Sequence, residues 1–381
     1  MSEQNLPLLL VASGHGSADW RYATGVELEQ GVFLDLGPEQ VLVTPELEYE
    51  RARVQGKVAT VIDRRESGWK ESRDAVAAWA GVARHLLRER GVEAVRVSPM
   101  LPVGYWEALR QAGVEMRIDP MLFVEQRRHK TPEEASFIHS AQRAAEAACA
   151  EIIAYLAVAE NKDGLLWLDR RPLTSERLMA RAEAALAEIG YTGGDMIVAG
   201  SPECALPHFR GEGQLRAGAP IIIDIFPQGK TSGYHGDLTR TVVVGEVPDE
   251  VNRMWDASCA ALDAGIAMLK AGVNGRDVHR EACRVLVEHG FGTYTEGFEG
   301  QVDGPRMNHS LGHGVGLDVH ESPNLRDLDY PLDAGDVVTV EPGLYKAGLG
   351  GVRVEDTGII TRDGFTNFTS LPRSLDPKAY L

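Results

Sequence analysis

The amino-acid sequence predicts a smaller α/β domain followed by a larger α+β domain. Strand and helix patterns alternate through about the first third of the chain, which is typical of an α/β domain. In the remainder, long helical patterns are grouped around separate apolar strands, which favours an α+β arrangement. A strong helix start lies between the two parts, and we therefore expect one domain over residues 1–128 and a second over residues 129–381.

In the first part, strands are expected at 8–11, 31–35, 40–44, 58–62, 94–97 and 114–118, and helices at 45–55, 72–90 and 103–112. The basic connector Gln126–Lys130 follows. The next residues, Thr131-Pro132-Glu133-Glu134, predict a helix start, because Thr131 can cap the helix, Pro132 suits its first turn and Glu134 completes a capping box.

The second part begins with this helix, expected at 132–159, and further helices are expected at 175–189, 249–270 and 276–289. Apolar runs predict strands at 221–226, 237–244, 337–341 and 351–360. We find no short repeat and no low-complexity segment.

Composition excludes several classes of function. The chain has 381 residues, 44% of them hydrophobic, and a net charge of −17, which argues against nucleic acid or an anionic membrane as a partner. No apolar stretch approaches the ~20 residues that span a membrane. The apolar run Leu6–Ala12 fits a first strand and lacks the charged start of a signal peptide. Scattered cysteines without a CxxC pair favour reduced thiols and a cytoplasmic location.

A glycine-rich stretch from Gly304 to Glu321 holds three histidines, His309, His313 and His320. Its glycine density argues against a helix and permits close approach of the backbone to a ligand or ion. Imidazole is a common metal ligand and acid or base near neutral pH. A solvated loop with incidental histidines remains an alternative from this stretch alone.

Four acids stand in two matched contexts. Asp224 and Glu341 each end an apolar strand. Asp237 and Glu355 each begin an acid-x-Thr segment that leads into another apolar strand. A buried ionised carboxylate is costly unless it is paired or binds a metal. Together the four acids therefore predict a cation site. With one imidazole they would form a mostly hard ligand set, suited to Mn, Co, Fe or Zn.

These residues carry a resemblance to the pita-bread metallopeptidases, the methionine aminopeptidase/creatinase/prolidase superfamily. The matching segments are Asp224, Asp237-x-Thr-Arg-Thr, His309-x-x-x-His313-Gly-x-Gly-x-x-x-His320-Glu321, Glu341-Pro-Gly and Arg353-x-Glu355-Asp. Within that superfamily the chain is most similar to the Xaa-Pro branch, which includes prolidase and aminopeptidase P. The resemblance implies a pita-bread catalytic domain preceded by a creatinase/prolidase-type α/β domain.

The resemblance also implies roles. It makes Asp224 a ligand of one ion through both oxygens, Asp237 and Glu355 bridging ligands, and His313 and Glu341 ligands of the second ion. Glu341 would also be the general base for a metal-bridging water. Manganese is the metal we expect first, with Co, Zn or Fe as alternatives.

The remaining family positions lie beside the substrate. His309 and His320 would stabilise the oxyanion and relay a proton to the departing proline nitrogen. His208 resembles a third accessory histidine, with a plain loop histidine as the alternative. Arg353 could brace the site by pairing with Asp237 or could contact substrate. Tyr345 matches a family tyrosine, although ordinary packing is equally compatible.

One departure from the family pattern concerns Asp224 and Asp237, which are thirteen positions apart. That spacing is longer than the usual family spacing by about two residues. We expect both aspartates still to reach the metal, across a longer glycine-containing turn. His235 in this turn is extra to the pattern and is expected to face solvent.

The sequence thus predicts a metallopeptidase with two divalent ions per chain that cleaves small peptides with proline in second place. The resemblance further suggests a homodimer, and the short first domain leans towards a dipeptidase over a longer-peptide aminopeptidase. Two alternatives remain, a creatinase-like C–N hydrolase and a non-catalytic pita-bread protein that binds a peptide or a partner. Both usually lack residues of the ligand set or the accessory histidines that this chain retains.

Overall fold

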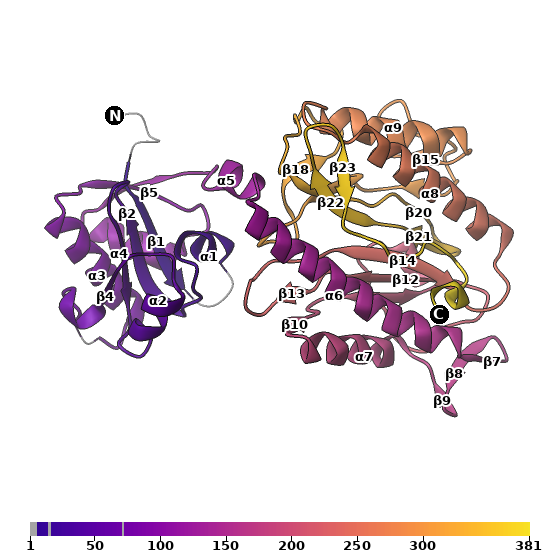
Figure 1. The fold of residues 1–381 in the computed structure, drawn as a ribbon, viewed down its shortest axis with the longest axis horizontal. Helices are drawn as coiled ribbons and strands as arrows, with labels where there is room; N and C mark the ends of the chain where they lie inside the picture. Colours follow the sequence, from indigo (N-terminus) through magenta and orange to yellow (C-terminus); the bar gives the residue numbers. More distant parts are fainter. Residues whose placement is uncertain (1–5, 14–16, 71) are drawn as a thin grey trace. The chain divides into compact units, whose positions relative to one another are not determined.

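The computed structural model describes residues 6–13, 17–70 and 72–381. The chain divides into two compact units, Met1–Glu125 and Gln126–Leu381 (Figure 1). No helix in the described ranges is both long and apolar enough to cross a membrane.

The first unit is built on a mixed six-stranded sheet of order β4-β3-β2-β1-β5-β6. The pairs β3–β4, β1–β5 and β5–β6 are parallel, and β1–β2 and β2–β3 are antiparallel. The strands are β1 (Leu8–Ser13), β2 (Gln30–Asp35), β3 (Gln40–Thr44), β4 (Thr60–Asp63), β5 (Ala94–Val97) and β6 (Glu115–Ile118). All six predicted strands are therefore confirmed, and each strand end lies within two residues of its predicted position.

The helices of this unit are α1 (Ala18–Thr24), α2 (Tyr49–Gln55), α3 (Ala75–Glu89) and α4 (Val103–Gln111), with the 3₁₀ turn η2 (Arg64–Glu66). Two separate apolar clusters form, one around α3 and α4 and one around α1 and α2. The sequence did not predict α1, whose seven residues are too few for a clear period, although Ser17 caps it. The helix expected from residue 45 begins only at Tyr49, since a turn precedes it.

The segment expected to be a polar connector is partly helical and is tied to the second unit. Helix α5 (Val124–Arg128) occupies its first part. Arg128 forms a buried ion pair of 2.8 Å with Asp336, and Lys130 Nζ lies 2.7 Å from Glu321. Arg128 and Lys130 are therefore not only polar connector residues, since each also forms an ion pair with a buried acid side chain.

In the second unit most of the strands lie between two pairs of helices, while those of residues 160–172 lie outside them (Figure 1). One pair is α6 (Pro132–Ala157) and α7 (Ser175–Glu188), and the other is α8 (Asp249–Met268) and α9 (Gly275–Glu288). The predicted capping box at the start of α6 is present. Each of the four predicted helices is confirmed to within two residues at either end.

The strands of this unit form several small sheets, and those near the site are a three-stranded sheet β11-β12-β14, a four-stranded sheet β15-β16-β20-β21 and a five-stranded sheet β18-β17-β19-β22-β23. The strands are β7 (Glu160–Lys162), β8 (Leu165–Leu168), β9 (Arg171–Pro172), β10 (Tyr191–Thr192), β11 (Ile197–Gly200), β12 (Pro220–Ile225), β13 (Gln228–Gly229), β14 (Leu238–Val243), β15 (Gly292–Thr293), β16 (Arg306–Met307), β17 (Gly312–Gly314), β18 (Glu321–Leu325), β19 (Val337–Val340), β20 (Gly343–Lys346), β21 (Gly350–Arg353), β22 (Asp356–Ile360) and β23 (Phe365–Asn367). The 3₁₀ turns η3 (Glu203–Ala205) and η4 (Pro377–Tyr380) complete the unit.

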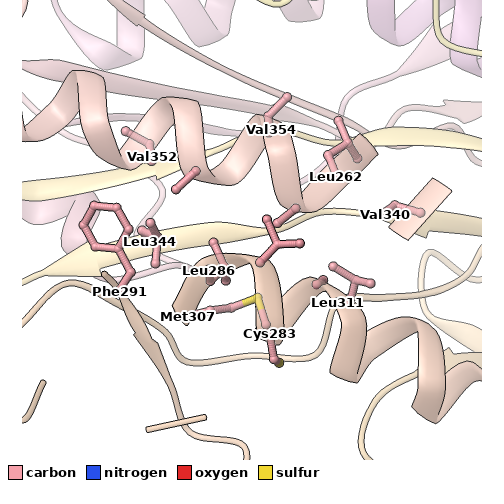
Figure 2. Packing of buried hydrophobic residues seen from close by; sticks show 14 of the residues in the cluster. Leu262, Cys283, Leu286, Phe291, Met307, Leu311, Val340, Leu344, Val352 and Val354 are labelled. Carbon is pink, nitrogen blue, oxygen red and sulfur yellow. The ribbon is translucent and has the colours of Figure 1, made fainter. Parts of the chain in front are cut away.

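Two apolar cores hold these layers together. One joins α6 and α7 to β11, β12 and β14. The other joins α8 and α9 to strands of the two larger sheets, and Figure 2 shows Leu262, Leu286, Val340 and Leu344 gathered within it. Because the apolar residues lie on the helix side, the polar ends of the strands are left to form a site.

One strand prediction is wrong. The run expected as a single strand over 351–360 is two strands in different sheets, since β21 pairs with β20 and β22 pairs with β19. The chain leaves the first ladder after Arg353 and enters the second at Asp356. Arg353 and Glu355 therefore do not share one face of a continuous strand, as the sequence pattern had indicated.

Candidate metal centre

The acidic residues lie at equivalent places in two antiparallel strand pairs. In the first pair, Asp224 of β12 stands opposite Thr239 of β14, and Asp237 immediately precedes β14. In the second pair, β19 ends opposite Asp356 of β22, so that Glu341 follows one strand and Glu355 precedes the other. The matched contexts seen in the sequence are thus matched strand ends in the structure.

Three of the expected ligands converge closely. Asp237, His313 and Glu355 are buried, and each offers one ligand atom within 4.8 Å of the others. His313 Nε2 lies 3.6 Å from Oδ2 of Asp237 and 3.6 Å from Oε1 of Glu341. This spacing is too long for hydrogen bonds but suits ligands of a shared ion, because atoms about 2.1 Å from one ion are roughly 3–4 Å apart.

The carboxylates are electrostatically unfavourable without a cation. Burial, together with repulsion from Glu355, Asp224 and Glu341, raises the pKa of Asp237 well above its usual range. Burial and the neighbouring carboxylates likewise raise the pKa of Glu355. For Glu341, burial raises the pKa to about 8. A divalent cation would supply the missing positive charge.

The orientation of His313 also fits a cation. Its Nδ1 lies 3.1 Å from the carbonyl oxygen of Gly314, so Nδ1 carries the proton and donates. The unprotonated Nε2 consequently faces the carboxylates of Asp237 and Glu341. Burial lowers the pKa of His313 to about 3, so the ring is neutral and its lone pair can bind a metal.

Asp224 adds a fourth carboxylate that is only half satisfied. Arg353 Nη2 lies 2.6 Å from its Oδ2, whereas its buried Oδ1 has no hydrogen-bond partner among the residues that the structure describes. The partner that the sequence suggested for Arg353 was Asp237, and the structure pairs it with Asp224 instead. A buried carboxylate oxygen without a partner in the described residues, beside the other expected ligands, fits a divalent metal centre of oxygen ligands and one imidazole.

A directed chain of hydrogen bonds runs alongside this cluster. Nδ1 of His309 lies 2.7 Å from the Ser310 carbonyl and must donate to it, so Nε2 accepts from the Tyr345 hydroxyl at 3.0 Å. Arg353 Nη1 in turn donates to the Tyr345 oxygen at 2.8 Å. Tyr345 thus links Arg353 to His309 by hydrogen bonds, and in this arrangement both ring nitrogens of His309 are occupied.

The other two histidines that the sequence suggested as accessory residues are exposed. His320 follows β17, its ring meets that of His313 edge-on with centroids 4.2 Å apart, and burial of part of the ring lowers its pKa. His208 lies in the loop after η3. We find no hydrogen bond to either ring within residues 6–13, 17–70 and 72–381, which leaves their nitrogens open to a ligand.

The longer turn between Asp224 and Asp237 is folded against its surroundings. Strand β13 within it pairs with β10, and Tyr234 donates a hydrogen bond of 2.7 Å to Glu134. His235 is only partly exposed and lies against the Gly316 carbonyl, 3.3 Å from Nδ1. Its expected solvent-facing position is therefore wrong, because the turn packs on the loop that leads to His320.

Two supporting residues were not assigned roles from the sequence. Thr239 donates through its hydroxyl to Oε2 of Glu355 at 2.8 Å. Arg240, fully buried, donates to the carbonyl of Glu355 and to the Asp356 carboxylate. Both belong to the segment Asp237-x-Thr-Arg-Thr, and an arginine within an apolar strand was a signal for buried partners.

Comparison with known proteins gives two family matches. Residues 136–362 match the model of metallopeptidase family M24, and residues 1–136 match that of the creatinase/prolidase N-terminal domain. The Xaa-Pro dipeptidase of Pyrococcus horikoshii is 27% identical over 383 residues, covering 98% of this chain and 96% of that protein. Xaa-Pro aminopeptidase 1 of Streptomyces coelicolor is 34% identical over 242 residues, covering 55% and 47%.

Solved structures give the same result. The prolidase from Pyrococcus horikoshii OT3 superposes with a TM-score of 0.78 at 26% identity, covering 98% of this chain and 96% of that one. The X-Pro aminopeptidase from Thermotoga maritima has a TM-score of 0.80 at 24% identity, with 97% of both chains covered, and shares the fold.

Proposed function

Because the chain belongs to metallopeptidase family M24, we propose that it is a dinuclear metal-dependent exopeptidase that cleaves the bond between an N-terminal residue and a following proline. The family matches also confirm the predicted fold, a pita-bread domain preceded by a creatinase/prolidase-type domain. The preference for proline is supported by the Xaa-Pro activities named for the relatives that align over most of the chain.

One observation carries the proposal: buried carboxylates converge with a neutral imidazole, and one carboxylate oxygen has no partner in the described ranges. We assign Asp224, Asp237, His313, Glu341 and Glu355 as ligands of two ions. Two ions held there would lower the pKa of the attacking water and polarise the peptide carbonyl. We keep manganese as the first choice of metal, with Co, Zn or Fe as alternatives.

Glu341 is the proposed general base. It follows β19, and its carboxylate is buried beside His313, where it can accept a proton from the water that attacks the peptide carbon. Its backbone N–H donates to the carbonyl of Leu311 at 2.7 Å, which fixes the residue to the histidine-bearing segment. That anchor keeps the base at one place relative to the substrate.

His320 is the proposed donor to the departing nitrogen. A proline imide nitrogen has no hydrogen and must gain a proton before it leaves, and the exposed ring of His320 has no competing partner among the described residues. His208 could hold the substrate from the same open side. We assign His309 and Tyr345 to positioning, because the Ser310 carbonyl and Tyr345 occupy the ring nitrogens of His309.

Dipeptides are the substrates we place first, since a relative of matching length is a Xaa-Pro dipeptidase. We also propose that the enzyme is a cytoplasmic homodimer, which the family resemblance and the four unpaired thiols support. Sedimentation equilibrium would test the assembly, and a monomer at micromolar concentration would contradict it.

The test is a substrate panel with protein that has been stripped of metal and reloaded with one metal at a time. We expect Ala-Pro and Met-Pro to be cleaved far faster than Ala-Ala and Met-Ala, and Xaa-Pro dipeptides faster than Xaa-Pro tripeptides. Equal kcat/KM for proline and alanine would refute the specificity. Full turnover by stripped protein would refute the metal requirement and favour a creatinase-like reaction.

A further inference from the structure

Asp237 lies just outside the sheet that positions it. Strand β14 begins at Leu238, and its ladder with β12 ends at the pair Ile225–Leu238. The backbone N–H and carbonyl of Asp237 therefore have no partner from β12. Asp237 is 4% exposed, so water cannot readily satisfy these two groups, and another part of the chain must do so.

Gln142 of α6 supplies both partners. The Asp237 N–H donates to Oε1 of Gln142 at 2.8 Å, and Nε2 of Gln142 donates to the Asp237 carbonyl at 2.8 Å. The side-chain amide thus pairs with Asp237 in the way a residue of a neighbouring strand would. Gln142 is fully buried, and its second N–H donates to Thr369 at 3.0 Å, so every polar hydrogen of its amide is used.

We propose that Gln142 is a positioning residue that sets the place of Asp237 in the metal centre from helix α6. The inference rests on the proposed function, since it takes Asp237 to be a ligand. Gln142 touches neither substrate nor metal in this role and acts only through the peptide groups of Asp237.

The close approach of this helix to the turn supports the role. A Cβ on Gly236 would lie 2.5 Å from the carbonyl carbon of Ala141, so only glycine lets the turn come this near to α6. The Asp237 carbonyl also accepts from the Thr357 hydroxyl at 2.7 Å. Helix α6 and strand β22 therefore hold the same peptide group from two sides.

This anchor has a particular use beside a longer turn. The turn from Asp224 packs on its surroundings through β13, Tyr234 and His235, but Asp237 follows these contacts and needs an anchor of its own. Metal ligands must be held within about 0.5 Å of a productive position. A bidentate contact from the buried face of helix α6 fixes Asp237 where the sheet no longer does. Loss of a supporting partner typically weakens metal binding about 10–100-fold.

Replacement of Gln142 by methionine, Q142M, tests the proposal. Methionine keeps the length and apolar stem but removes both hydrogen bonds with Asp237 and the one to Thr369. The dissociation constant for Mn²⁺ is measured by competition with a chelator on the full-length protein. The matched control is E146M, one turn further along α6, where Glu146 accepts hydrogen bonds from the backbone of Ser370 and Leu371 and does not contact a proposed ligand.

We expect Q142M to weaken Mn²⁺ binding by about tenfold or more, while E146M changes it less than about threefold. Q142A, which favours helix, is the second variant should Q142M not fold, and it should also weaken binding. Wild-type affinity in the folded Gln142 variant would overturn the proposal, as would an equal loss in E146M. A wild-type protein that binds no metal would instead refute the proposed function itself.

Discussion

Arg353 donates a hydrogen bond of 2.6 Å to Oδ2 of Asp224, and within the described part of the chain the other oxygen of that carboxylate has no partner. The guanidinium is 3% exposed and also binds the Tyr345 hydroxyl. Its positive charge offsets part of the repulsion among the buried acids. Arg353 therefore partly replaces the cation charge while leaving one oxygen of Asp224 open.

The first prediction follows from this pair. Replacing Arg353 by methionine removes the positive charge that pairs directly with Asp224, and breaking a buried pair typically costs about 3–5 kcal/mol. We expect R353M to lose this much in free energy of unfolding without metal, and clearly less with saturating Mn²⁺, because the ion restores positive charge. Urea unfolding with and without metal measures the difference.

The control for this experiment is another buried arginine pair. Arg128 lies 2.8 Å from Asp336, away from the proposed ligands. R128M should lower the free energy of unfolding by the same amount with and without Mn²⁺. A loss in R353M that is unaffected by metal would show that Arg353 does not compensate for the ion.

The sequence predicted the α+β arrangement and the candidate ligands because both depend on local patterns. Helix ends carried clear signals, such as the Thr131 cap, and acids at the ends of apolar strands required a cation. It did not predict that residues 351–360 form two strands. A chain that crosses between sheets keeps the apolar pattern of both strands, so the sequence pattern does not indicate the break before Glu355.

The supporting hydrogen bonds could not be predicted for a different reason. The pairing of Gln142 with Asp237 joins residues 95 positions apart, and nothing in an alanine-rich helix marks one glutamine as a partner. Arg353 forms its ion pair with Asp224 and not with Asp237, and this too depends on which strand ends lie next to each other. Such contacts follow from the packing of helices on sheets, which single-sequence patterns do not specify.

The second prediction concerns the hydroxyl between Arg353 and His309. Replacing Tyr345 by phenylalanine removes the donor to His309 Nε2 and the acceptor for Arg353. We expect Y345F to lower kcat by about tenfold or more, with KM changed less than threefold and metal content unchanged, because only the orientation of the ring is lost. Steady-state kinetics beside metal analysis measures this, and a variant with wild-type kcat would assign Tyr345 to packing.

The third prediction concerns acid stability. His279 of α9 accepts a hydrogen bond from the Leu311 N–H through Nδ1 and contacts Thr295 through Nε2 at 2.7 Å. Burial lowers its pKa to about 4, with Asp327 and Arg280 as the charged neighbours. The unfolded chain therefore takes up a proton near pH 6.5 that the folded protein does not, and stability falls as pH drops from 6.5 to 4.

That difference in pKa corresponds to about 3 kcal/mol at pH 4. Replacing His279 by glutamine keeps a donor and an acceptor but removes the titration. We expect the free energy of unfolding of H279Q to fall less than that of the wild type over this pH range, when both are measured without metal. Parallel curves for the two proteins would show that His279 is not a source of the acid sensitivity.

The fourth prediction separates a ligand from a residue that acts on substrate. Glu355 is 2% exposed, belongs to the three-residue ligand group and has a raised pKa, whereas His320 is exposed and without a hydrogen-bond partner in the described ranges. Glu355→Ala should lose both metal and activity. His320→Ala should keep its metal and lose about 10²–10³-fold in kcat, because only a proton donor or oxyanion contact is removed.

The two variants should therefore be similarly poor enzymes with different metal contents. Metal analysis after gel filtration, beside kcat and KM for a Xaa-Pro dipeptide, distinguishes them. Raising the Mn²⁺ concentration should not restore the activity of either variant. In His320→Ala the metal site is already filled, and Glu355→Ala lacks a proposed bridging ligand. A metal-free His320→Ala would place that histidine among the ligands, and a fully loaded Glu355→Ala would remove Glu355 from them.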